Sequence, residues 1–387
     1  MPARQTDISG FPLRNPLIAG ACVLGVFALG AGAIALLAPE REAAVSARAM
    51  LDLPERAPEI VEIAVAEAAR PVIFEETPEE DGLSLPGVRE AEDALGGEVQ
   101  PPPGSNAARA LAAPRAPQAP LPGLSEPGPG GPLPVIGPDG TRPSLAYARP
   151  FAGDSGAPAI AIIVGGLGVS ESLTEAAIDN LPPEITLSFV PYARNLQSWI
   201  DRARTAGHEV MIELPMEPFD YPNNDPGPHT LMAEASQAEN ARRLHWLLSR
   251  GAGYFGVTNY LGARLATSET ALAAIYRELS ERGLAVFHDG AGRRGAAGGA
   301  ARRAGTPLVI ADRLLDTNPS ARAIDERLLE LEALALQNGT ALGSGFAYPV
   351  TVGALQRWAQ GLEARGYQLA PASHVARQRA GHDGRDT

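Results

Sequence analysis

The sequence contains no lysine, so arginine supplies all 32 of its basic residues, against 45 aspartate and glutamate residues. The formal net charge is −13, and no segment is rich enough in arginine to form a broad basic face for phosphate contacts. Cysteine is nearly absent as well, since Cys22 is the only one and lies in an apolar run. These absences exclude an intramolecular disulfide and a soluble thiol active site, and they argue against nucleic acid as a partner.

Aromatic residues are scarce between Pro39 and Pro150, where only two occur. The same stretch holds 20 of the 36 prolines, and its 18 acidic residues outnumber its 9 arginines. A chain of this composition buries too little apolar surface to offset the entropy that ordering would cost. We therefore expect residues 39–155 to be a disordered, acidic, proline-rich linker that lets the folded region extend away from the N-terminal segment.

An uninterrupted apolar run of 22 residues covers Leu17–Ala38. As a helix it would extend about 33 Å, at about 1.5 Å per residue, which is enough to cross a bilayer. Arginine occurs twice before the run, at positions 4 and 14, whereas the residues after the run are Glu40, Arg41 and Glu42. This asymmetry favours residues 1–16 in the cytoplasm, 17–38 as a single-pass anchor in a bacterial inner membrane, and the remainder in the periplasm. A cleaved signal peptide is the alternative, because small residues near Ala38 would suit cleavage.

From residue 156 onward, short apolar runs alternate with stretches of helical period. The expected strands are Ala159–Val164, Ile185–Val190, Glu209–Leu214, Tyr254–Val257, Leu284–Phe287, Leu308–Ile310, Ala341–Gly343 and Tyr367–Ala370. A glycine closes most of the expected helices shortly before the next strand, at positions 207, 251, 283, 305, 339 and 366. Such alternation is typical of a parallel sheet covered by helices. We predict one α/β domain at 156–375, a (β/α) barrel with about seven parallel strands rather than a doubly wound open sheet, and a polar tail at 376–387.

Two helix starts carry local signals. Ser236 and Glu239 have the spacing of a capping box, in which the hydroxyl and the carboxylate each accept from a free backbone N–H. Pro319 and Ser320 precede a long helix that is expected to end near Asn338.

Several motifs follow one another in order between Ala159 and Ser373. They are IIVGGLG at 162–168, LPPEITLSFVPYA at 181–193, GHEV at 207–210, LPMEP at 214–218, GVTNYLG at 256–262, DRLLD at 312–316 and GSGFAYP at 343–349. Together they resemble the divergent polysaccharide deacetylase family. The resemblance implies a polysaccharide-deacetylase-like (β/α) barrel and, for active relatives, metal-dependent removal of acetyl groups from polysaccharide.

The resemblance also implies which positions hold the metal in active relatives, and this sequence departs from the pattern at each of them. The aspartate pair after the first strand corresponds to Gly165 and Gly166, and the two histidines correspond to Tyr260 and Phe346. Glycine and phenylalanine have no side-chain ligand atom, and tyrosine is a poor zinc ligand compared with histidine. We therefore expect no metal cofactor and a loss of the usual metal-dependent activity.

Acidic and histidine side chains remain near the carboxyl ends of the expected strands, where barrel active sites gather. The candidates for catalysis are Glu213, His288, Asp289, Asp312 and Asp316. Two carboxyl groups can perform acid–base chemistry on a glycan, so a hydrolase with a relocated acidic site is one hypothesis. The alternative is that these acids cap helices or fix loops.

The loop at 216–231 is long and rich in proline and aromatic residues, as loops that form one wall of a ligand groove can be. Its Phe219 and Tyr221 would suit stacking on sugar rings, whereas a rigid surface loop is the alternative. Asn259, Tyr260 and Tyr348 are further candidates for substrate contact.

The leading hypothesis is a membrane-anchored periplasmic protein whose deacetylase-like barrel binds envelope glycan, such as peptidoglycan, or an envelope protein. It would do so without metal-dependent deacetylation. The first alternative is an active carbohydrate hydrolase with a relocated acidic site. The second is a purely structural role, in which the linker lets the barrel reach a partner.

Overall fold

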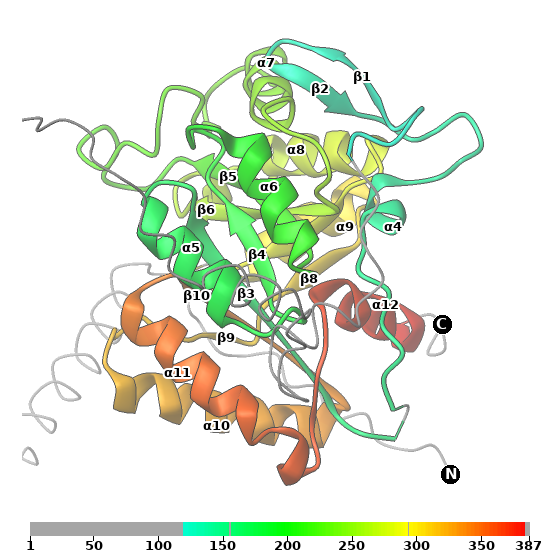
Figure 1. Cartoon of the computed structure of the whole chain (residues 1–387). Helices are drawn as coiled ribbons and strands as arrows, with labels where there is room; N and C mark the ends of the chain where they lie inside the picture. The colour runs from blue at the N-terminus through cyan, green and yellow to red at the C-terminus, as the bar shows by residue number, and fades with distance from the viewer. Residues whose placement is uncertain (1–118, 155, 293, 384–387) are drawn as a thin grey trace, which may run out of the picture. The chain divides into compact units, whose positions relative to one another are not determined.

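Helices and strands alternate along the chain from Ala159 to Asp383 in the computed structural model (Figure 1). The structure describes residues 119–154, 156–292 and 294–383, all of which belong to one unit of the chain, residues 86–387. The expected anchor at 17–38 and the first part of the expected linker lie outside the described residues. Within the described residues, no helix is both long enough and apolar enough to cross a membrane.

The main sheet is parallel and contains nine strands. They are β3 (Ala159–Leu167), β4 (Thr186–Phe189), β5 (Val210–Met216), β6 (Gly256–Leu261), β7 (Ala285–His288), β8 (Leu308–Ile310), β9 (Arg313–Leu314), β10 (Thr340–Phe346) and β11 (Gln368–Leu369). The order is β8-β7-β6-β5-β4-β3-β10-β9, and β11 pairs with the start of β3. The predicted parallel α/β sheet is thus confirmed.

The strands β8 and β9 are consecutive parts of one segment that changes its partner. The N–H of Ala311 donates to the carbonyl of His288 on β7, and the N–H of Asp312 donates to that of Leu342 on β10. The path of paired strands therefore returns to the segment from which it starts, which curves the sheet into a barrel-like layer. With β8 and β9 counted as one segment, seven parallel segments form this layer. The short β11, which pairs with β3, is not included in the seven.

Eight helices of the described chain accompany the sheet. They are α5 (Glu171–Asn180), α6 (Leu196–Thr205), α7 (Gln237–Leu248), α8 (Glu269–Glu281), α9 (Arg294–Ala304), α10 (Ala321–Asn338), α11 (Pro349–Gln360) and α12 (Ala372–Asp383). Ser320 caps α10 as predicted, and Ser236 caps α7 by accepting from the N–H of Glu239. The second half of the predicted capping box differs, because the carboxylate of Glu239 pairs with Arg242 and Arg243 on the same helix.

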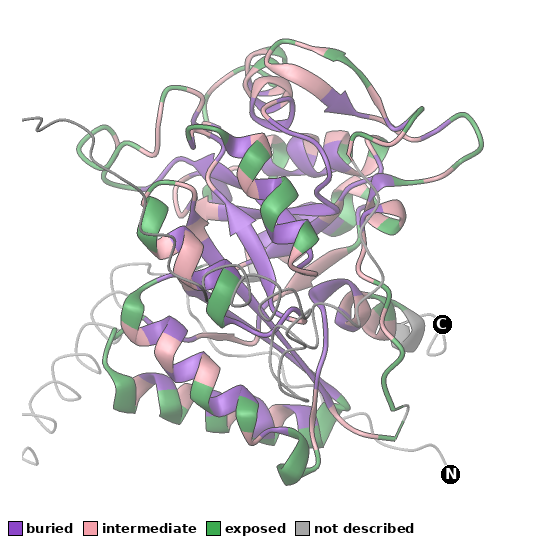
Figure 2. Ribbon diagram, in the orientation of Figure 1, coloured by how far each residue is buried: buried purple, intermediate pink, exposed green. Residues whose placement is uncertain are grey.

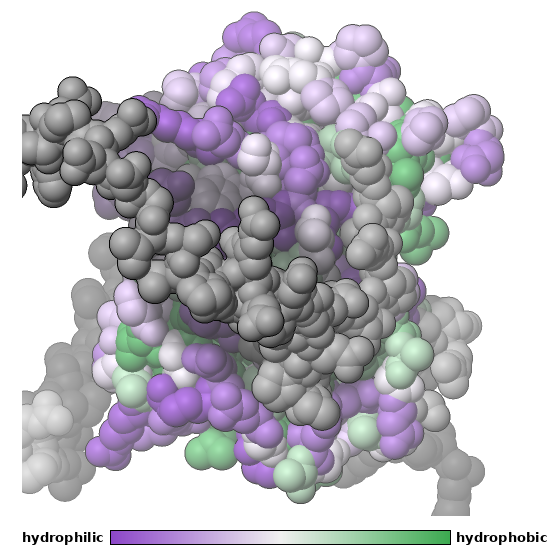
Figure 3. All heavy atoms as spheres, viewed as in Figure 1, coloured by the Kyte–Doolittle hydropathy of each residue, from purple (hydrophilic) through white to green (hydrophobic). Residues whose placement is uncertain are grey.

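Alternate residues of the strands belong to two apolar clusters on opposite faces of the sheet. Along β3, Ile160, Ile162 and Val164 join the cluster that the surrounding helices cover. Ala161 and Ile163 instead join an inner cluster, because successive side chains of a strand point to opposite faces. The strands are accordingly buried along most of their length, whereas the helices expose their outward sides (Figure 2). Hydrophilic residues make up most of the visible surface over α10 and α11 (Figure 3).

The expected linker ends earlier than predicted, because residues 119–154 are folded against the barrel. They form the antiparallel strands β1 (Ser125–Gly128) and β2 (Gly131–Pro134) and the short helix α4 (Pro143–Ala146). Leu124 and Tyr147 are buried in the inner cluster, 4% and 5% exposed. The composition of this segment, which is rich in proline and glycine, did not indicate that it is folded. A few apolar residues, among them Leu124 and Tyr147, pack it against the barrel.

The end of the domain also differs from the prediction, since α12 continues to Asp383 where a polar tail was expected. Arg379 of this helix donates to the carbonyl of Ile310 and pairs with Asp312 at 2.5 Å. At the start of α12, the N–H of Ser373 donates to the buried carboxyl of Glu209. That carboxyl also accepts from the N–H of Arg149, so one buried group ties the N-terminal segment and α12 to β5.

Candidate functional site

A cavity of about 560 Å³ opens at the carboxyl ends of the strands, a volume typical of small-molecule sites. The pairing register brings the inward-facing positions together there. Pro215 of β5 lies beside Tyr260 of β6, and Phe346 of β10 lies beside Gly165 of β3. The wall includes Tyr192, Glu213, Tyr260, Leu261, Phe346 and Tyr348.

Glu213 is the only charged residue in the described wall of this cavity. Its side chain is 4% exposed, and its Oε1 accepts from the N–H of Gly166 at 2.5 Å. Burial raises the pKa of this carboxyl to about 7, against the opposing effect of the Gly166 hydrogen bond, and the charge of Asp289 adds to the increase. Among the described residues Glu213 forms no ion pair, so near neutral pH it holds its proton about half of the time.

The glycine at position 165 is explained by Glu213. A Cβ at Gly165 would lie 2.4 Å from Oε1 of Glu213, which is closer than real Cβ contacts allow. The carboxyl of β5 therefore occupies the space into which a side chain at 165 would extend. This end of the barrel thus contains an acid, Glu213 of β5, next to the glycine at position 165.

The positions that hold a metal in active relatives do not fit one in this chain. Gly165, Gly166 and Phe346 supply no side-chain donor, and Glu213 blocks the space beside Gly165. Within the described residues, no group of three or more histidine, cysteine, aspartate or glutamate side chains is arranged to hold a metal ion. The described wall of the cavity contains one carboxyl, that of Glu213, together with the hydroxyl of Ser170 and the side chains of Tyr192, Tyr260, Phe346 and Tyr348.

Three aromatic rings form a continuous surface beside Glu213. The rings of Tyr260 and Phe346 meet edge to face, with centroids 6.2 Å apart, and the rings of Phe346 and Tyr348 are 6.0 Å apart. Tyr348 is 44% exposed, so this surface extends from the cavity to solvent. Burial raises the pKa of the Tyr260 hydroxyl, which keeps that group neutral. Sequence analysis named Tyr260 and Tyr348 as substrate contacts, and both line the cavity.

Asn259 supports the rim of the cavity through the backbone. Its amide nitrogen donates to the carbonyl of Leu261 at 2.9 Å, and its amide oxygen accepts from the N–H of Asp289 at 2.9 Å. Leu261 lines the cavity and has a φ of 60°, in the left-handed region that costs a leucine about 1–3 kcal/mol. Strain of this kind persists where the surroundings fix it, and the two hydrogen bonds of Asn259 hold the backbone at Leu261 and Asp289.

His288 and Asp289 follow β7 and lie next to each other in space. The Nδ1 of His288 is 3.3 Å from Oδ1 of Asp289 and accepts from the N–H of Gly290 at 3.1 Å. Of the predicted catalytic group, Asp289 is near enough to Glu213 to raise its pKa.

The two remaining catalytic candidates lie elsewhere and have structural partners. Asp312 accepts from the N–H of Leu342 and pairs with Arg379, where the segment 308–314 crosses from β7 to β10. Asp316 accepts from the N–H of Phe346 at 2.7 Å and from the hydroxyl of Thr351 at 2.9 Å. The five predicted catalytic residues therefore do not form one cluster, and Asp316 instead fixes the turn that carries Phe346.

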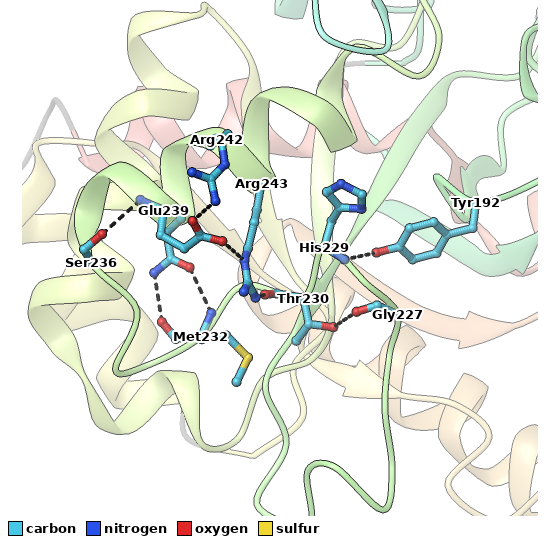
Figure 4. A network of polar contacts seen from close by, with 10 residues as sticks. Tyr192, Gly227, His229, Thr230, Met232, Ser236, Glu239, Arg242 and Arg243 are labelled. Atoms are coloured by element: carbon cyan, nitrogen blue, oxygen red, sulfur yellow. Dashed lines mark hydrogen bonds and ion pairs between the residues drawn. The ribbon is translucent and has the colours of Figure 1, made fainter.

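The loop at 216–231 forms part of the cavity wall, although through a different residue from those predicted. Pro226 lines the cavity, whereas Phe219 is 59% exposed and neither Phe219 nor Tyr221 belongs to the wall. Figure 4 shows how the end of this loop is held: the N–H of His229 donates to the hydroxyl of Tyr192, and Arg243 of α7 donates to the carbonyl of Thr230. Such anchoring makes this wall a fixed surface.

Sequence reasoning missed Tyr192 and the hollow next to it. Tyr192 lines the cavity, and with Val169 it also lines a second hollow that reaches Trp199 of α6. A Cβ at Gly227 would lie 2.3 Å from the Tyr192 ring, so the loop can approach this ring only with a glycine there. The available signal was the position of Tyr192 directly after a buried strand, where parallel sheets gather functional residues.

Comparisons with known proteins agree with the fold. A family model described as divergent polysaccharide deacetylase matches residues 162–376. The uncharacterized protein YibQ of Escherichia coli is 24% identical over 198 residues, which is 51% of this chain and 61% of that protein. An uncharacterized protein of Haemophilus influenzae is 22% identical over 197 residues, 51% of this chain and 69% of that protein. The match therefore spans about three fifths of the Escherichia coli relative.

Among solved structures, an uncharacterized protein from Agrobacterium tumefaciens is similar to this chain over most of the described region. It is 39% identical with a TM-score of 0.62, and the alignment covers 63% of this chain and 99% of that protein.

Proposed function

Because the chain belongs to the divergent polysaccharide deacetylase family, we propose that its cavity binds an amino-sugar glycan without metal-dependent deacetylation. The observation that carries the proposal is the composition of the cavity, in which Tyr260, Phe346 and Tyr348 surround the single carboxyl of Glu213. Aromatic faces pack against the C–H faces of sugar rings, and a carboxyl at the base can orient a polar group. The cavity volume of about 560 Å³ suits a short piece of such a polymer.

The shared wall of the two hollows supports binding of a chain rather than of a single sugar. Val169 and Tyr192 belong to both hollows, and Trp199 lies in the wall of the second. A linear glycan can follow this surface with one sugar ring over the cavity and the next toward Trp199.

We expect β-1,4-linked glucosamine tetramers, in their acetylated or deacetylated form, to bind the purified full-length protein saturably. Tyr260→Ala and Phe346→Ala should each weaken binding about tenfold, which corresponds to about 1.4 kcal/mol and to the loss of one ring contact. Isothermal titration calorimetry, repeated with a chelator and with added zinc, measures both effects. Phe219→Ala is the matched control, because this exposed aromatic lies on the same face of the fold but outside the wall.

The competing outcomes of this experiment are distinct. Failure of both tetramers to bind would refute the proposal. If Phe219→Ala weakened binding as much as Tyr260→Ala and Phe346→Ala do, the glycan would bind at the loop instead of in the cavity. Release of acetate from the acetylated tetramer in the presence of metal would show that the protein is a metal-dependent deacetylase. Tetramers shortened by the wild type but not by Glu213→Gln would favour the second candidate, a hydrolase, for which the raised pKa of Glu213 and the nearby charge of Asp289 are the supporting observations.

We further propose that the apolar run Leu17–Ala38 anchors the protein in the inner membrane, with the barrel in the periplasm. The length of the run and the arginines before it support this orientation. A reporter active only in the periplasm, fused after residue 387, should be active, and the protein should remain with membranes after a high-salt wash. An inactive reporter would contradict the orientation. A soluble, N-terminally shortened protein would instead support the cleaved signal peptide.

A further inference from the structure

The charge of the cavity limits the ligands that it can hold. The described wall contains no arginine or histidine, and the whole chain contains no lysine, so the wall offers no cation to an anionic ligand. Its single ionisable acid is Glu213, and the charge of Asp289 also reaches this carboxyl. An anionic ligand would meet a repulsive carboxyl without a compensating partner, which leaves neutral and cationic ligands.

The carboxyl itself is arranged to receive a donor. Among the described residues, the one hydrogen bond to Glu213 is that from Gly166 to Oε1, and Oε2 has no hydrogen-bond partner. Two of the other buried acids have an arginine as counterion, since Glu217 pairs with Arg264 and Glu332 pairs with Arg365. A buried carboxylate without a counterion is costly, and a cationic ligand that supplies one removes this cost.

The aromatic rings favour the same class of ligand. A cation over the face of a tyrosine or phenylalanine ring is attracted by the negative charge of the π face, most strongly where water is excluded. Tyr260 and Phe346 meet at an interplanar angle of 84°, so the two rings present their faces in different directions around the space beside Glu213. A carboxyl with several ring faces is the combination that recognises organic ammonium groups.

We propose that the cavity binds an alkylammonium group, and that in its glycan ligand this group is the free amine of a deacetylated amino sugar. This inference rests on the proposed function, because the glycan is the source of the ammonium. The ammonium donates to Oε2 of Glu213 and packs against the rings of Tyr260 and Phe346, while the sugar ring extends toward Tyr348. The acetylated residue lacks the charge and presents an amide to the same carboxyl.

The test compares glucosamine tetramer with N-acetylglucosamine tetramer on the full-length protein at pH 7, with ethanolamine as a ligand that carries a primary ammonium but no sugar. We expect the deacetylated tetramer to bind at least about tenfold more tightly than the acetylated one, and Glu213→Gln to reduce this ratio to about one. Glu281→Gln, which removes an exposed acid at the far end of α8, should leave the ratio unchanged.

A second readout follows from the proton on Glu213. The pKa of this carboxyl is about 7, and a bound cation lowers it, so ethanolamine binding at pH 7 should release protons. Calorimetry in buffers of different ionisation enthalpy measures the release, which should vanish in Glu213→Gln.

Each outcome separates this inference from the proposed function. Equal binding of the two tetramers leaves glycan binding in place and refutes the ammonium proposal. A preference that persists in Glu213→Gln refutes the role of that carboxyl. Binding of ethanolamine with no binding of either tetramer overturns both the proposed function and the amino-sugar source of the ammonium.

Discussion

Replacement of Tyr147 by alanine should lower the free energy of unfolding by about 3–5 kcal/mol. Tyr147 is 5% exposed in the inner cluster, and its ring packs under the guanidinium of Arg204, 5.0 Å from the ring centroid. Its hydroxyl accepts from the N–H of Leu121 at 2.8 Å. The truncation therefore opens a cavity in the core and removes the contact that fixes the start of the folded segment. Urea-induced unfolding of the full-length protein, followed by circular dichroism, measures the change.

Tyr147→Phe is the matched control for this prediction. It keeps the ring and removes only the hydrogen bond to Leu121, so it should cost about 1 kcal/mol. If Tyr147→Ala unfolded at the same urea concentration as the wild type, residues 119–154 would be a tether after all, as their composition suggests.

Glu213 should make the protein less stable as the pH rises. The pKa of this carboxyl is about 7 in the folded protein, against an ordinary value of 4.5 for a glutamate. Between these values the unfolded chain ionises Glu213 while the folded protein keeps it protonated, so ionisation favours unfolding. The stability is fully present below about pH 4.5 and falls as the pH rises through about 7. The shift corresponds to about 3 kcal/mol in total, at about 1.4 kcal/mol per pKa unit.

The measurement is the free energy of unfolding at several pH values between 4.5 and 8 for the wild type and for Glu213→Gln. Glutamine keeps an oxygen for the N–H of Gly166 but does not ionise. In this variant the free energy of unfolding should therefore fall less steeply with pH than in the wild type. Burial also raises the pKa of Glu209, which contributes in the same direction, so the difference between the two proteins isolates Glu213. Equal slopes in both proteins would mean that Glu213 is ionised in the folded state.

Local signals allowed most of the fold to be predicted from the sequence. The third short run, expected at 209–214, is β5 at Val210–Met216, and the run at Leu308–Ile310 is β8 with the same bounds. The helix before β10 begins after Ser320 and ends at Asn338, with Gly339 at a φ of 76°. Caps and glycine ends act within a few residues, so they can be read without knowledge of the tertiary structure.

The candidate site was less predictable, because it depends on contacts between distant residues. The sequence predicted no acid at position 165, but the contact of Gly165 with Glu213, 48 positions later, becomes visible only in three dimensions. Asp312 was assigned to the site because it follows a strand, and its actual partner, Arg379, lies 67 positions away in what was expected to be a tail. The position of a residue at the end of a strand thus identified candidates for the site. The contacts of each side chain in the structure then showed which candidates line the cavity and which have structural partners.

Residues at this end of the barrel are connected by contacts. In the structure Glu213 occupies the space in which a side chain at position 165 would begin, and Asp316 accepts from the backbone N–H of Phe346. With Tyr260 opposite, these residues convert the end of the barrel into an aromatic cavity around one carboxyl. The proposed functions depend on this arrangement of residues.

A crystal structure of the protein with bound glucosamine tetramer decides whether the cavity holds the amino sugar. We expect one sugar in the cavity, with its amine within hydrogen-bond distance of Glu213 and its ring against Tyr260, Phe346 or Tyr348. A tetramer bound only at another surface, or a metal ion held by Glu213 and Asp289 beside the sugar, would contradict this expectation.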